Sequence, residues 1–185
     1  MARGIHRVGG LAGLILAALA YFFHVGSGAG TSTKYDSGSP RSAPSGAGML
    51  SDFSGPVVSV HDGDTIQVRY LDKNVKIRLW GVDCPEVSPA QDCGQDARIF
   101  ANEMVMGKTV RVEVHDRDKY GRVVGEVFVG DKSLNAALVE SGWAWAYRHY
   151  TLKFAALEEL AHARHIGLWA HPNPEPPWDF RRETK

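Results

Sequence analysis

Five short segments in which apolar residues alternate with polar ones constrain the fold more than any other feature of this sequence. Three of them follow one another within residues 56–79, separated by the turn formers Asp62-Gly63 and Asp72-Lys73-Asn74. Two more run over residues 110–115 and 123–129. Because successive side chains of a strand point to opposite faces, a period of two predicts half-buried strands. The sequence therefore predicts a three-strand meander followed by two further strands.

Three other segments predict helices, and a glycine follows each of them closely. They run from Cys93 to Met106, from Ser133 to Ser141 and from Thr151 to His165. In the last segment Leu152, Ala156 and Leu160 recur at helical spacing, with Leu157 and Ala161 beside them, so we expect this stripe to be core.

The order of these elements indicates the fold class. One helix falls between the third and fourth strands, and the other two follow the fifth. This order describes an α+β, mainly β, fold: an OB-type five-stranded barrel with three helices. The Pro-rich tail from His171 to Arg182 is expected to lie extended across the domain as an apolar strap.

The first 50 residues differ in composition from the rest of the chain. A basic start is followed by the apolar run Leu11 to Phe23 and then by small residues, which is the order of a secretory signal. Residues 1–25 are interpreted as a signal peptide or, because the apolar run is nearly long enough to span a bilayer, as an uncleaved membrane anchor. Residues 26–50 are expected to form a flexible Gly/Ser/Pro linker before the folded domain, residues 51–185. Either interpretation predicts an extracytoplasmic domain: secreted, periplasmic or anchored to the membrane.

The chain has two cysteines, Cys84 and Cys93. An exported compartment permits them to pair, so we expect a disulfide between them, with two free buried thiols as the alternative. A metal site built on the two thiols is disfavoured, because no histidine lies nearby at a usable spacing.

The charge of the domain argues against binding of nucleic acid through a general basic field. From Ser51 onward there are 17 Lys and Arg against 20 Asp and Glu, a net charge of −3. Nonspecific affinity for nucleic acid comes from neutralising phosphates, which normally requires a basic domain. Any phosphate binding by this chain must therefore be local.

Oxygen ligands gather around the third predicted strand. Asp64 lies in the turn before the second strand, and Asp83 follows the third. Their carboxylates are hard ligands suited to Ca²⁺ or Mg²⁺, and the backbone carbonyl of Cys84 could be a third ligand.

Three further residues near these ligands have side chains suited to phosphodiester hydrolysis. Glu86, in the loop after the third strand, could hold and deprotonate a water, while Arg78 and Arg122 could each donate two hydrogen bonds to phosphate oxygens. Each residue also has a simpler structural explanation, such as a turn, a surface ion pair or a charged hairpin. A single mechanism, however, accounts for all of them together.

Three segments of this sequence resemble the thermonuclease (staphylococcal nuclease-like) family. They are His61-Asp62-Gly63-Asp64-Thr65, Arg78-Leu79-Trp80-Gly81-Val82-Asp83-Cys84-Pro85-Glu86 and Asp118-Lys119-Tyr120-Gly121-Arg122. The similarity extends from about Gly55 to Trp169. One departure is Cys84, where the family more often has Thr; a ligand supplied by the backbone carbonyl survives that change.

The resemblance implies a Ca²⁺-dependent nuclease that acts on both DNA and RNA and leaves 3′-phosphate ends. We expect a monomer that binds one Ca²⁺ ion, with Mg²⁺ or Mn²⁺ as less favoured ions. The resemblance also implies three sets of site residues: the calcium ligands Asp64, Asp83 and Cys84; the catalytic residues Arg78, Glu86 and Arg122, with Glu86 as general base; and the substrate-binding residues Lys119, Tyr120, Tyr147 and Tyr150. An alternative is a catalytically inactive OB-type module that binds nucleic acid or protein.

Overall fold

The computed structural model describes residues 51–184. The predicted signal or anchor in residues 1–25 and the linker in residues 26–50 lie outside this range. Within the described part of the chain, no helix combines the length and the apolar character needed to cross a membrane.

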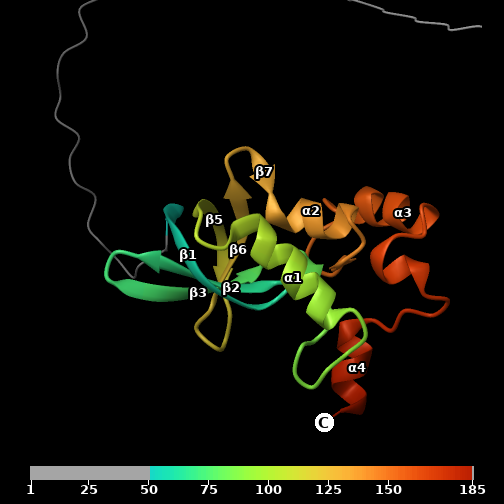
Figure 1. Ribbon diagram of the computed structural model, residues 1–185. Coiled ribbons are helices and arrows are strands. Elements are labelled where there is room, and N and C mark those ends of the chain that lie inside the picture. The colour runs from blue at the N-terminus through green and yellow to red at the C-terminus, as the bar shows by residue number, and fades with distance from the viewer. Residues whose placement is uncertain (1–50, 185) are drawn as a thin grey trace, which may run out of the picture. The chain divides into compact units, whose positions relative to one another are not determined.

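Five strands form a closed barrel, as the sequence pattern predicts (Figure 1). Neighbouring strands pair antiparallel in the order β3-β2-β1-β5-β6, and a parallel pairing between β3 and β6 closes the barrel. The strands are β1 (Phe53–Asp62), β2 (Thr65–Tyr70), β3 (Lys73–Leu79), β5 (Thr109–Arg117) and β6 (Val123–Val129). The meander β1-β2-β3 is confirmed, and so is the OB-type barrel.

Three two-residue strands join the barrel to the segments around it. They are β4 (Val82–Asp83), β7 (Lys132–Ser133) and β8 (Trp145–Ala146). β4 and β8 pair antiparallel with each other, outside the main sheet. β7 pairs antiparallel with the end of β6.

The described residues contain four α-helices, where the sequence predicts three. They are α1 (Gly94–Val105), α2 (Leu134–Glu140), α3 (Ala155–Ala163) and α4 (Pro177–Glu183), and a 3₁₀ helix, Gly167–Ala170, precedes the last. In Figure 1, α1 lies across the barrel, α2 and α3 lie together on one side, and α4 lies near the C-terminus.

One apolar core fills the barrel and extends under the first two helices. Ile66, Val68 and Ile77 are fully buried strand residues within it. The helices contribute Ala97, Ala101 and Val105 from α1 and Leu134 and Leu138 from α2. Burial of this continuous surface is the main stabilising contribution to the domain.

The predicted core stripe of the third helix is wrong. Leu152 is 71% exposed and Leu160 is 50% exposed, while the side that faces inward carries Phe154, Leu157, Glu158 and Ala161. Both sets follow helical spacing, and the buried set contains a charged residue, Glu158, which conceals it in a hydrophobicity pattern. The carboxylate of Glu158 is buried with partners, since it accepts a hydrogen bond from the Ala146 amide at 2.8 Å and another from Arg148 at 2.9 Å.

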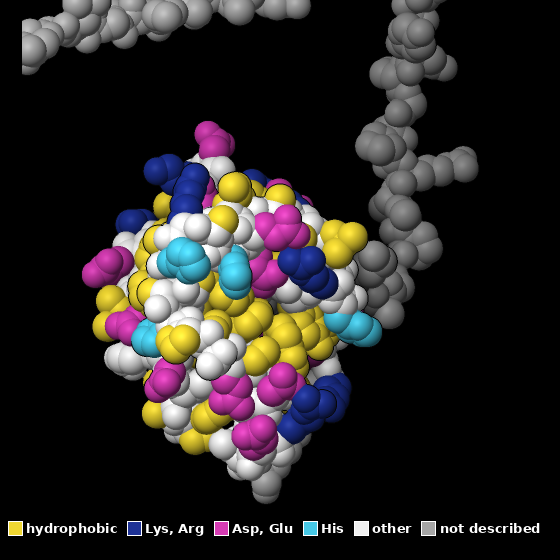
Figure 2. Space-filling model, turned by 90° about the vertical axis from the view of Figure 1, so that its right-hand side faces the viewer, with side chains coloured by type: hydrophobic (Ala, Val, Ile, Leu, Met, Phe, Trp, Pro, Cys, Tyr) yellow, Lys and Arg dark blue, Asp and Glu magenta, His cyan; other side chains and the backbone are white. Residues whose placement is uncertain are grey.

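The C-terminal tail is not the extended strap that its proline content predicts. Pro177 occupies the first turn of α4, where a proline lacks only an amide hydrogen that would have no helical partner. The apolar contacts of the expected strap do form, because the Trp178 ring packs 5.6 Å from that of Trp145 and 5.5 Å from that of Tyr147. Figure 2 shows the side of the molecule on which α3 and α4 lie, with hydrophobic side chains gathered between charged ones.

Candidate active site

One pocket of about 410 Å³ contains most of the residues singled out in the sequence. It lies at one end of the barrel, where β3, the loop after β4 and the β5–β6 loop meet the segment before α3. The predicted site residues that line it are Asp64, Arg78, Asp83, Glu86, Tyr120, Arg122, Tyr147 and Tyr150. The fold therefore brings these side chains together in one pocket.

Strand register places Arg78 beside Asp64. In the β2–β3 pairing Arg78 lies opposite Thr65, and the Leu79 amide donates to the Asp64 carbonyl at 2.8 Å. The Arg78 guanidinium forms ion pairs with both Asp64 and Asp83. The face of β3 that carries Arg78 is thus a cleft wall, a point that the alternation of the strand alone leaves open.

Asp83 is held by the short pairing of β4 with β8. Asp83 lies opposite Trp145, and two residues further along the chain the Tyr147 amide donates to the Gly81 carbonyl at 2.9 Å. This pairing explains how Tyr147, far away in sequence, lines the same pocket as Asp83. Asp64 and Asp83 are each only 2% exposed.

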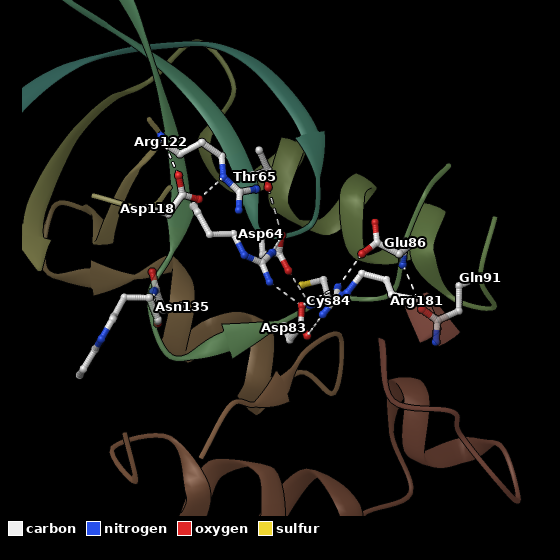
Figure 3. A network of polar contacts seen from close by, with 12 residues as sticks. Asp64, Thr65, Asp83, Cys84, Glu86, Gln91, Asp118, Arg122, Asn135 and Arg181 are labelled. Carbon is white, nitrogen blue, oxygen red and sulfur yellow. Dashed lines mark hydrogen bonds and ion pairs between the residues drawn. The ribbon is translucent and has the colours of Figure 1, made fainter. Parts of the chain in front are cut away.

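The backbone of Cys84 joins the two aspartates, because its amide donates to Asp64 Oδ2 at 2.6 Å (Figure 3). Its side chain points away from the pocket and is buried against Gly63. A Cβ added to Gly63 would lie 2.7 Å from the Cys84 sulfur, so the two residues are in close contact. Burial raises the pKa of this thiol, so it stays protonated.

The expected disulfide does not form, and both cysteines are free thiols. Cys84 is enclosed by the core, whereas Cys93 is only partly buried and its sulfur lies 3.4 Å from His171 Nε2. The two sulfurs therefore have different surroundings, and the alternative of two free thiols is correct, although Cys93 is less buried than expected.

Glu86 is placed by a tight contact between its loop and the start of α1. The Glu86 amide donates to Gln91 Oε1 at 3.1 Å, and the Gln91 amide donates to the Glu86 carbonyl at 3.0 Å. A Cβ on Gly94 would lie 2.1 Å from the same carbonyl, so only glycine permits this approach. The carboxylate of Glu86 is left facing the pocket.

Asp118 organises the loop between β5 and β6. Its Oδ1 accepts hydrogen bonds from the Tyr120 and Arg122 amides, both at 2.9 Å, and its Oδ2 accepts one from Arg122 Nε at 2.6 Å. Burial acts to raise the pKa of Asp118, but the hydrogen bonds and charge of Arg122 outweigh it and lower this pKa below its usual value. The guanidinium of Arg122 is thereby aimed at the pocket.

Lys119 is the one predicted substrate-binding residue that does not line this pocket. It lies in an adjoining hollow of about 600 Å³, which shares Tyr120, Arg122 and Tyr150 with the pocket. The Lys119 ammonium lies 5.1 Å from the centre of the Tyr120 ring, as expected for neighbours in one hairpin loop. Tyr120 is 73% exposed and Tyr150 62% exposed, so both rings are available to a ligand.

Arg181, on α4, is a site residue that the sequence analysis missed. Its Nη2 donates to Asp83 Oδ2 at 2.6 Å, and its Nη1 donates to Glu86 Oε1 at 2.6 Å and to Asp83 Oδ1 at 3.2 Å (Figure 3). Burial acts to lower the pKa of Arg181, but the hydrogen bonds and charges of Asp83 and Glu86 more than compensate and raise it. The only signal in the sequence is a pair of arginines in a tail that looks apolar.

The donor chemistry of the pocket fits a hard divalent cation. Among the residues that the structure describes, no cluster of three or more His, Cys, Asp or Glu side chains is arranged to hold a metal ion. The predicted set is smaller: two buried carboxylates and one backbone carbonyl, all oxygen ligands. Five carboxylates and three guanidinium groups line the pocket, a net charge of −2 that a dication would balance.

Comparisons with known proteins agree with this geometry. The model of the family described as "Staphylococcal nuclease homologue" matches residues 76–171, which include Arg78, Asp83, Glu86 and Arg122. An uncharacterized endonuclease of Escherichia coli is 39% identical over 136 residues, which cover 72% of this chain and 88% of the relative. The micrococcal nuclease of Shigella flexneri is 35% identical over 147 residues, which cover 72% of this chain and 83% of the relative.

A third relative, an uncharacterized endonuclease of Haemophilus influenzae, is 36% identical over 132 residues and covers 70% of this chain and 73% of its own. The family model spans more than half of the chain, and these relatives are matched over most of their length. The chain therefore belongs to the family of staphylococcal nuclease homologues, a family of nucleases.

Proposed function

We propose that the chain is a calcium-dependent endonuclease that hydrolyses phosphodiester bonds of both DNA and RNA and leaves 3′-phosphate ends. One observation carries the proposal: a buried carboxylate pair, a loop carboxylate and two guanidinium groups on separate elements meet in a single pocket. The printed names of the relatives, endonuclease and micrococcal nuclease, support this reaction class.

Asp64 and Asp83 would hold the cation, together with the backbone carbonyl of Cys84. A bound Ca²⁺ supplies positive charge that offsets the negative charge developing on the phosphate oxygens. Both carboxylates are buried and held by hydrogen bonds or strand pairing, so their own positions are set by the fold.

Glu86 would accept a proton from the attacking water, since its carboxylate faces the pocket at the edge of a loop fixed by Gln91. As the water oxygen bonds to phosphorus, the bond from phosphorus to the 5′-oxygen breaks, which leaves the phosphate on the 3′ side. Arg78 and Arg122 would donate to the phosphate oxygens, where charge increases as the reaction proceeds.

Tyrosine rings that line the pocket would bind the nucleotides next to the cleaved bond. Tyr120, Tyr147 and Tyr150 would stack on bases or donate to phosphates, and Lys119 would meet the chain in the adjoining hollow. The binding would be local, consistent with a domain whose net charge is negative.

We also propose that the enzyme acts outside the cytoplasm, as a monomer, after export directed by residues 1–25. The support is the basic, apolar and small-residue order of that segment. Fractionation of cells that express the chain tests this placement, because activity confined to the cytoplasm would contradict it.

The decisive experiment incubates the purified full chain with plasmid DNA and with RNA, in Ca²⁺ and in Ca²⁺ with excess chelator. Cleavage in Ca²⁺ alone, with 3′-phosphate ends on the products, is the expected result. Substrates left intact under both conditions would refute the proposal, and retention of intact nucleic acid by the protein would then favour the inactive binding module. Cleavage in Mg²⁺ or Mn²⁺ but not in Ca²⁺ would refute the calcium requirement alone.

A matched pair of variants tests the role of Glu86. Glu86→Gln removes the proton acceptor at constant volume and should slow cleavage by about 10² to 10⁴-fold without changing the unfolding temperature by much. Glu159→Gln makes the same change on an exposed position of α3 and should cleave like the wild type. Equal activity of the two variants would remove Glu86 from the mechanism.

A further inference from the structure

Arg181 brings a third guanidinium group into the pocket, from outside the residues that the family model matches. It is the only described donor to Asp83 Oδ2, and the only one to the carboxylate of Glu86. The two contacts measure 2.6 Å each, and the side chain of Arg181 is 38% exposed. Arg181 is therefore hydrogen-bonded to Asp83, a predicted cation ligand, and to Glu86, the predicted general base, at the same time.

We propose that Arg181 sets the metal affinity of the site by competing with the divalent cation for Asp83 while it covers Glu86. This inference rests on the proposed function, because it takes Asp83 as a cation ligand and Glu86 as the base. In the absence of cation the guanidinium pairs with both carboxylates and offsets part of their negative charge. Before a cation can bind Asp83, and before Glu86 can accept a proton, the Arg181 guanidinium must move away from these carboxylates.

The distribution of donors over Asp83 supports competition rather than co-binding. Asp83 Oδ1 already accepts from both Arg78 and Arg181, which uses both of its lone pairs. Asp83 Oδ2 accepts from Arg181 alone, so loss of this contact leaves a complete carboxylate oxygen open to the pocket. A positive charge next to that oxygen also repels a dication directly.

The position of Arg181 is built into the fold rather than being that of a loose surface side chain. Trp178, one turn earlier on α4, packs against Trp145 and Tyr147. The Gln91 side chain, which fixes the Glu86 loop, also donates to the Glu175 carbonyl just before α4 at 2.7 Å. These contacts hold α4 next to the loop that carries Glu86, so Arg181 can withdraw by side-chain rotation while α4 stays docked.

The adjacent Arg182 provides a matched control. It is on the same helix and carries the same charge, but its side chain is 76% exposed and pairs with Asp179 within α4. Calorimetric titration of Ca²⁺ into the metal-free full chain should show binding about tenfold tighter for Arg181→Ala than for the wild type. Arg182→Ala should stay within about twofold, because an exposed charge is screened.

Arg181→Gln serves as a second variant that keeps most of the side-chain volume, in case truncation disturbs α4. It should also bind Ca²⁺ more tightly than the wild type. Without metal, both Arg181 variants should unfold at a lower temperature than the wild type, since Glu86 loses its described partner and Asp83 keeps only Arg78. Ca²⁺ should raise that temperature more than it does for the wild type.

The failure of this inference can be told apart from the failure of the proposed function. If the wild type binds Ca²⁺ and cleaves but neither Arg181 variant binds the ion more tightly than Arg182→Ala, the competition is refuted and the nuclease proposal stands. If no variant binds Ca²⁺ and none cleaves in its presence, both are refuted.

Discussion

Asp118 shows how much of this site depends on one residue outside the proposed catalytic set. Three donors converge on its carboxylate, two of them backbone amides, and they fix the loop that carries Tyr120 and Arg122. The same contacts lower its pKa in the folded state. A depressed pKa of a carboxyl group stabilises the fold above the ordinary pKa of the group, and that contribution is lost as the pH falls through the folded-state value.

Asp118→Asn should therefore be destabilising in a pH-dependent way. At pH 7 the variant is expected to lose about 1 kcal/mol of unfolding free energy, a modest figure for a surface loop contact. Below about pH 4, the ordinary value for Asp, the difference from the wild type should shrink, because the wild-type carboxyl is then increasingly protonated. Urea unfolding at both pH values measures the difference; a gap that stays constant would contradict the assigned cause.

At the same scale, the sequence supports some residue predictions and not others. Asp64, Arg78, Asp83, Glu86 and Arg122 can be grouped from the sequence because their side chains suit one reaction and their segments resemble one family, although the strand pattern alone does not show which face is the cleft. Arg181 was not, since its contact with Asp83 spans 98 residues and no periodicity connects the two. The thiol state of Cys84 was misjudged because sequence spacing does not reveal that its side chain points into the core.

Among the elements, α2 begins directly after the serine at which the sequence predicts its start. Ser133 caps it by accepting a hydrogen bond from the Ala136 amide at 3.1 Å, and the same hydroxyl donates to the buried Glu126 at 2.7 Å. The neighbouring Lys153 ammonium completes the partners of Glu126 at 2.6 Å. One hydroxyl thus serves both a helix end and a buried charge.

Ser133→Ala is expected to cost about 1–2 kcal/mol of unfolding free energy, because the cap and one donor to Glu126 disappear together. Ser133→Thr keeps the hydroxyl and should lose much less. Chemical denaturation of the two variants makes the comparison, and equal losses would mean that volume rather than hydrogen bonding matters at this position.

The elements that the sequence mispredicts share a physical cause. For α3, the exposed and the buried stripe have the same helical spacing. Which of them faces inward depends on tertiary contacts, namely the packing of Phe154 in the core and the hydrogen bond that Glu158 accepts. For α4, prolines suggest an extended chain, yet a proline in the first turn is compatible with a helix once Trp178 has a surface to pack on. The local sequence pattern of each helix does not show the surface on which it packs, which other parts of the chain provide.

On the scale of the whole molecule, Asn135 connects the helical side to the barrel. It is fully buried on α2, accepts from the Val127 amide at 3.1 Å and donates to the Trp80 carbonyl at 2.8 Å. It therefore joins β6, the end of β3 and a helix through one side chain. Such a residue is costly to replace, because two buried backbone groups depend on it.

Asn135→Leu should lower the unfolding free energy by about 2–4 kcal/mol, since the apolar and somewhat larger side chain leaves the Val127 amide and the Trp80 carbonyl without this partner. Asn102→Leu, the same change at an exposed position of α1, should be close to neutral. Thermal unfolding followed by circular dichroism compares them; similar midpoints for the two variants would show that Asn135 is not the connection described.

The pairing of distant segments around the pocket has a consequence for the order of folding. Asp64 and Cys84 are 20 positions apart and Asp83 and Arg181 are 98 apart, whereas the hairpins of the barrel close over short loops. Long loops close at a higher entropic cost, so contacts of high sequence separation form late. A chain that has folded only its hairpins holds the acidic and basic groups of the pocket apart, so we expect the complete pocket, with Arg181 still covering Glu86, to form only in the last step of assembly.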